Sequence, residues 1–122
     1  MNQIAKGENV AIDPNGPLPT ITIKIGSIAI GTYSSYLIKD ASHPLICKGK
    51  SNQPVKSCPI GTISSALPGC KVSWQVGIAG TNPNAPFTIG ITLMQGDATL
   101  GQYDYSGQGD ELLVDYVTII SK

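Results

Sequence analysis

The chain has 122 residues, of which 13% are charged, and its eight lysines balance eight acids without any arginine. This length suits a single domain with its own core. The neutral balance and the lack of arginine argue against nucleic-acid binding, because no basic excess is available to neutralise phosphates. No apolar run reaches the roughly 18 residues of a transmembrane helix, so we expect no transmembrane segment.

The first 19 residues are predicted to form an N-terminal arm, followed by one domain over 20–122. The arm lacks the basic start and apolar stretch of a signal peptide, which favours a cytoplasmic protein or export by another route. The turn-forming residues at 13–17 separate the arm from the first predicted strand. We expect the arm to lie on the surface or on a neighbouring copy, or to be disordered.

Two strand regions come after the arm. Ile21, Ile23 and Ile25 alternate with polar residues, which is the period of a strand with one buried face. The second region, 28–38, ends at a break over 39–44.

The segment 49–69 is the least regular part of the chain, because prolines interrupt it and only Ile60 and Ile63 suggest a short strand. Long irregular loops often carry function. The alternative is a loop that covers one end of the core.

The segment 71–120 contains four runs of strand-forming residues. In the first run the apolar residues alternate with polar ones and are predicted to face the core: Val72, Trp74, Val76 and Ile78. The run 87–93 repeats the pattern. Gly96-Asp97 suits a two-residue hairpin loop, and Gly101 marks a predicted bulge where the alternation changes face.

The last run, 112–120, is apolar on both faces, as in a central or doubly covered strand, and Asp115 is its one charge. We interpret the four runs as an antiparallel meander. The whole chain then has about seven strands and is predicted to be all-β, an antiparallel β-sandwich, with a small β-barrel as the alternative.

Cys47, Cys58 and Cys70 are odd in number and cannot all pair within one chain. A Cys58–Cys70 bridge would close the irregular loop and contribute about 3 kcal/mol, whereas a reducing compartment would leave three thiols. The missing signal peptide favours thiols.

His43 and the three cysteines would supply the four ligands of a zinc site, but their spacing lacks the tight Cys-x2-Cys pair. A catalytic His43/Cys47 pair lacks an orienting group.

The candidate ligand site lies late in the chain, at Tyr103, Asp104, Tyr105, Asp110 and Glu111. The three acids flank the turn 106–109 and would converge if 103–105 paired with 112–114. Converging carboxylates suit calcium, although no EF-hand pattern is present. The two tyrosines share a strand face, as a stacking platform for a sugar requires; partial burial at a sheet edge is the alternative.

Residues 1–71 carry a net charge of +4 and residues 72–122 a net charge of −4. Such a split favours head-to-tail association between copies, unless the strands of the two halves interleave.

We therefore expect a non-enzymatic β-sandwich module for binding or self-assembly, which forms a homo-oligomer and takes a protein or glycan ligand. The alternative is a carbohydrate-binding, lectin-like domain, with or without calcium. A small hydrolase is less favoured, because the sequence shows no nucleophile–base spacing and a small sandwich offers little wall for a glycosidase cleft.

Overall fold

The computed structural model describes residues 3–27, 29–79 and 82–122, and the regular secondary structure in this part of the chain is almost entirely β-strand. In the first half they are β1 (Asn9–Ile12), β2 (Thr20–Ser27), β3 (Ile30–Ile38), β4 (Leu45–Lys50) and β5 (Ser57–Pro59). A short 3-10 turn, η1 (Ser64–Ala66), precedes β6 (Lys71–Ala79), β7 (Pro86–Gln95), β8 (Ala98–Gln108) and β9 (Glu111–Ser121).

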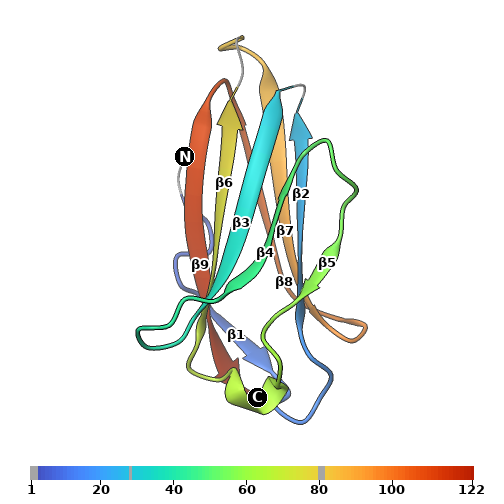
Figure 1. Ribbon diagram of the computed structural model, residues 1–122, viewed down its shortest axis with the longest axis vertical. Coiled ribbons are helices and arrows are strands. Elements are labelled where there is room, and N and C mark those ends of the chain that lie inside the picture. Colours follow the sequence, from blue (N-terminus) through green and yellow to red (C-terminus); the bar gives the residue numbers. More distant parts are fainter. Residues whose placement is uncertain (1–2, 28, 80–81) are drawn as a thin grey trace.

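The strands form two sheets that pack face to face (Figure 1). Sheet A has the order β1-β9-β6-β3-β4, and sheet B has the order β5-β2-β7-β8. The predicted β-sandwich is therefore confirmed, with nine strands in the described residues where about seven were expected. Each sheet mixes strands from both halves of the chain, so the positive and negative halves interleave.

The core lies between the sheets and consists of the alternate residues that the period-two pattern predicts. On β6, Val72, Trp74 and Val76 are fully buried. On β7, Ile89 and Ile91 face them from sheet B with at most 1% of their surface exposed. The prediction that Trp74 belongs to the core is confirmed.

The connections of the C-terminal block differ from the predicted meander. Among the described residues of this block, consecutive strands pair only at β7 and β8, which form a hairpin. The strands β6 and β9 pair with each other in sheet A, antiparallel, with Val76 opposite Leu113. The chain crosses between sheets before β7 and again after β8. The two crossings lie together, because Gly109, at a φ of +75°, donates a backbone hydrogen bond to Ala85. Alternation predicts which face is buried but not which strand is the neighbour.

Two local predictions in the β7–β8 hairpin are confirmed. Gln95 pairs with Ala98, so that Gly96-Asp97 forms the two-residue loop, and Gly96 adopts a φ of +60°. The register then shifts next to Gly101, whose neighbour on β7 is Leu93. This is the predicted bulge, and it turns the following residues of β8 to the opposite alternation.

The N-terminal arm is part of the sandwich. Its β1 pairs with β9 in parallel, from Asn9 opposite Thr118 to Ile12 opposite Ser121. Val10 and Ile12 point into the core with 4% and 1% exposure. The expected surface arm is thus an edge strand of sheet A, because its alternating apolar residues complete the core beside β9.

The irregular segment contains β5, which pairs with β2, and the turn η1. Ile60 and Leu67 are buried at 1% and 2% exposure, and the part of the segment that follows β5 covers the lower end of the core in Figure 1. Nowhere in the described residues is there a helix with the length and apolar character needed to cross a membrane.

Candidate functional site

The structure separates the five residues of the predicted ligand site. Tyr103 and Tyr105 share a face of β8, as predicted, but this face points inward and each side chain is only 4% exposed. Tyr103 stacks on Trp74 with ring centroids 5.5 Å apart. The tyrosines therefore form part of the core and not an exposed platform for a sugar ring.

The acids of the predicted site lie elsewhere. Asp104 is exposed on the outer face of sheet B, where it accepts a 2.9 Å hydrogen bond from Gln102. Asp110 and Glu111 lie where the chain crosses to sheet A, and β8 pairs with β7 in place of β9. Within the described ranges, no three His, Cys, Asp or Glu side chains gather as metal ligands. Calcium binding remains a prediction without a preformed cluster to support it.

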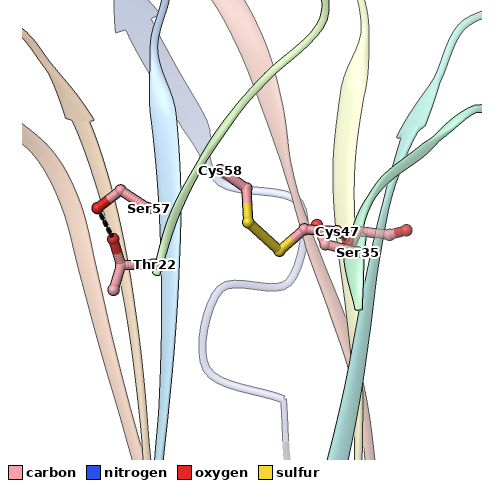
Figure 2. The surroundings of a disulfide bond; sticks show 6 residues. Thr22, Ser35, Cys47, Ser57 and Cys58 are labelled. Carbon is pink, nitrogen blue, oxygen red and sulfur yellow. Dashed lines mark hydrogen bonds between the residues drawn. A yellow bond between two sulfur atoms is a disulfide. The ribbon is translucent and has the colours of Figure 1, made fainter. Parts of the chain in front are cut away.

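The cysteines pair differently from either expectation. Cys47 of β4 and Cys58 of β5 form a disulfide with their Cα atoms 6.1 Å apart (Figure 2). Cys70 is a buried thiol. The proposed Cys58–Cys70 bridge and the all-thiol state are therefore both wrong for this structure. The reason is topological: β4 and β5 are edge strands of opposite sheets that face each other, so the disulfide joins the two sheets.

The disulfide lies in a well-defined setting. Cys58 is opposite Ile21 on β2, and the neighbouring Thr22 and Ser57 hydroxyls are 2.8 Å apart (Figure 2). Cys47 is opposite Ser35 on β3. Each cysteine is thus placed by a paired neighbour strand, and the bond closes one side of the sandwich.

A buried carboxylate network was missed by sequence reasoning. Asp115 is fully buried on the inner face of β9, and its Oδ2 accepts hydrogen bonds from the backbone N–H groups of Ile4 and Ala5, both at 2.9 Å. Its Oδ1 accepts from the N–H groups of Lys6 and Tyr116, also at 2.9 Å. The carboxylate therefore fixes the start of the chain against β9.

The same carboxylate connects the two sheets. The Tyr105 hydroxyl donates to Asp115 Oδ2 at 2.6 Å, and the Trp74 indole N–H donates to that hydroxyl at 3.3 Å. Burial acts to raise the pKa of Asp115, but the hydrogen bonds from Tyr105 and the backbone outweigh it and lower the pKa. In the sequence, this network is marked by one charge in an apolar strand. Its other members leave no pattern of residue types, because most of the donors are backbone groups.

Beside this network, Tyr103 donates a 3.1 Å hydrogen bond to Glu8 in the N-terminal arm. Burial and this bond raise the pKa of Tyr103 to about 12. Burial and the bond to Asp115 likewise raise the pKa of Tyr105. Because these groups satisfy one another and Asp115 is shielded from solvent, we assign the network a structural role.

An open groove of about 530 Å³ lies on the outer face of sheet A and is a candidate for ligand binding. It crosses four strands along one cross-strand row: Lys50, Thr32, Gly77 and Leu112. The next row adds Lys48, Ser34 and Gln75. We call these seven residues the sheet A groove. Gly77 contributes to the hollow because it places no side chain there.

The groove combines cationic, hydrogen-bonding and apolar groups. Lys48 and Lys50 are exposed along β4, at one side of the groove. Leu112 is 59% exposed at the other side, on β9. Hydroxyl and amide groups lie between them. No known protein family, curated protein or solved structure matches this chain significantly.

Proposed function

We propose that this chain is a non-catalytic binding module that holds an acidic oligosaccharide in the sheet A groove. The observation that carries the proposal is the pairing of two lysines, Lys48 and Lys50, with a strip of hydroxyl and amide side chains in one groove. The lysine ammonium groups attract carboxylate or sulfate groups. Threonine, serine and glutamine side chains exchange hydrogen bonds with sugar hydroxyls.

The size and rigidity of the groove support this ligand class. Ligand sites typically have volumes of about 300–1,000 Å³, and the groove has about 530 Å³. Its residues are spread over β3, β4, β6 and β9, which are hydrogen-bonded to one another. A ligand that binds such a preformed surface loses little free energy to ordering of the protein.

The composition of the groove also supports binding without catalysis. None of the described residues that line it is an acid, a histidine or a cysteine. Histidine and carboxylate side chains most often act as the general acid or base, and a hydroxyl nucleophile is usually activated by such an adjacent base. The buried Asp115 lies on the inner face of β9, away from this surface.

The proposal is tested by titration calorimetry with trigalacturonate and, as a neutral trisaccharide of the same ring number, maltotriose. We expect trigalacturonate to bind more tightly and to weaken as salt is added. The double variant Lys48→Gln/Lys50→Gln should weaken trigalacturonate binding about tenfold, since each exposed charge pair contributes up to about 1 kcal/mol.

Lys24→Gln is the matched control, because Lys24 is an exposed lysine on the outer face of sheet B. It should leave the affinity within about twofold of the unmodified chain, as an exposed lysine far from the ligand contributes little. If Lys24→Gln weakened trigalacturonate binding as much as the double variant, net charge alone would account for the attraction of the ligand. That result, or equal affinity for the two trisaccharides, would overturn the proposal.

Self-association is a second candidate, supported by apolar side chains on the outer face of β9. Leu112 and Val114 are 59% and 49% exposed there, and exposed apolar patches often mark protein interfaces. Sedimentation analysis across a concentration range tests it: Leu112→Ser/Val114→Thr should abolish an oligomer that the unmodified chain forms. A strict monomer at high concentration would exclude it.

A further inference from the structure

A second hollow, of about 350 Å³, lies between the beginning of β4 and the segment that leads from β5 through η1. We call it the apolar crevice. Its lining is mostly aliphatic and includes Leu37, Leu45, Ile63, Ala66 and Leu67, together with Lys39. It is separate from the sheet A groove, because the two share no lining residue.

The crevice has a buried apolar floor and exposed apolar rims. Leu37 and Leu67 are 8% and 2% exposed, whereas Leu45 and Ile63 are 49% and 60% exposed on either side. Exposed apolar side chains that gather around a hollow often mark a ligand-binding site. Among the described residues that line the crevice, Lys39 is the single charged one.

The walls of the crevice are held in place by the backbone. Lys39 and Ser42 exchange two backbone hydrogen bonds, at 2.9 and 2.8 Å, and Leu37 N–H donates to Pro44 at 2.9 Å. On the other wall, Leu67 N–H donates to Ser64 at 3.1 Å.

The Cys47–Cys58 disulfide adds a covalent link between the walls, because Cys47 follows Ile46 and Cys58 precedes Pro59. The hollow is therefore present before any ligand arrives, which lowers the ordering cost of binding.

We propose that the apolar crevice binds a free medium-chain aliphatic carboxylate, with its chain between Leu45 and Ile63 and its carboxylate paired with Lys39. An aliphatic chain matches the lining, and one anionic head matches the one cation. The volume lies at the small end of ligand sites, which suits a single chain. A concave apolar surface receives a chain, whereas insertion into a membrane needs apolar groups that project outward.

The proposal is tested by amide NMR titration of the whole chain with hexanoate, octanoate and decanoate below their micelle concentrations. Shifts should be saturable and centred on residues 37–46 and 59–67. Each methylene that enters the crevice should strengthen binding by up to about fourfold, until the crevice is filled. Absence of saturation, or shifts centred on the sheet A groove, would overturn the proposal.

Lys39→Gln separates the contribution of the carboxylate–lysine pair from that of the buried aliphatic chain. It should weaken decanoate binding about two- to fivefold and leave binding of decanol unchanged, as expected for one exposed charge pair. Lys56→Gln is the matched control, because Lys56 is an exposed lysine that precedes β5 and does not line the crevice. Equal effects of Lys39→Gln on decanoate and decanol would contradict the assigned role of Lys39.

Ala66→Phe tests the crevice itself, because Ala66 is an exposed residue of η1 in its lining. The larger side chain should abolish binding of both decanoate and decanol. Ile63→Ser, at an exposed rim, provides a second variant that leaves the core unchanged and should weaken both ligands severalfold. Unaltered binding in these variants would overturn the site. Amide signals of the crevice residues that shift with protein concentration alone would also overturn the proposal, because a second copy of the chain would then occupy the crevice.

Discussion

Tyr105 of β8 donates a 2.6 Å hydrogen bond to the carboxylate of Asp115 on β9, so one buried contact joins sheet B to sheet A. The carboxylate also accepts the backbone N–H groups of Ile4, Ala5 and Lys6. A single side chain therefore holds two sheets and the N-terminal arm together. Nearly all its hydrogen-bonding capacity is used inside the protein, which accounts for a charge in the core.

Asp115→Asn should destabilise the protein by about 3 kcal/mol in urea unfolding, because an amide NH2 would face groups that are themselves donors. The arm should lose protection first, with faster hydrogen exchange at residues 4–7. Asp104→Asn is the matched control, since Asp104 lies exposed on the outer face of β8. It should change stability by less than about 0.5 kcal/mol. Similar losses for both variants would contradict the role of Asp115.

The same carboxylate predicts how stability depends on acid pH. The pKa of Asp115 is lowered by folding, so its stabilisation is complete above the ordinary carboxyl pKa of about 3.9. It is lost as the pH falls through the lower folded pKa. Unfolding followed between pH 6 and pH 2 should show this loss in the unmodified chain and a shallower one in Asp115→Asn. If stability fell equally steeply with pH in the two proteins, protonation of Asp115 would not be linked to unfolding.

Tyr103 predicts the corresponding behaviour in alkali. Its pKa is raised to about 12, chiefly by burial, from an ordinary value of about 10. Its contribution to stability should therefore be complete below about pH 10 and decrease as the pH rises towards the folded pKa. Tyr103→Phe should cost about 1 kcal/mol at neutral pH, through the lost bond to Glu8, and should flatten the alkaline decrease. An unchanged alkaline slope would contradict this assignment.

The Cys47–Cys58 disulfide should contribute about 3 kcal/mol, as expected for a short closed loop. Cys47→Ser/Cys58→Ser should lower the free energy of unfolding by about that amount while the sandwich still folds. Adding reductant should lower the free energy of unfolding of the unmodified chain to a similar level and should leave that of the double variant unchanged. If reductant destabilised the double variant equally, the effect would arise elsewhere, and the pairing would need revision.

The features that the sequence predicted correctly depend on local spacing. Val72, Trp74 and Val76 face the core because side chains alternate along a strand. Gly96 forms the hairpin loop because glycine accepts positive φ. Neither inference requires knowledge of the partner strand.

The features that were predicted wrongly, or missed, depend on which strands meet. The meander was wrong because β6 and β9 pair across two sheet crossings. The predicted disulfide was wrong because Cys47 and Cys58 lie on facing edges of different sheets. The sheet A groove was missed because its lysines and Leu112 come from distant strands, and no spacing along the chain brings them together.

The parallel alignment of β1 and β9 has a mechanical consequence. Because these strands run the same way, opposite forces applied at Gln3 and at Lys122 would pull β1 and β9 in opposite directions along their length. The hydrogen bonds between them would then be loaded together in shear and not opened one at a time. The grip of Asp115 on residues 4–6 adds resistance along the same line. The hydrogen bonds of the β1–β9 pair would therefore have to break together under such a force.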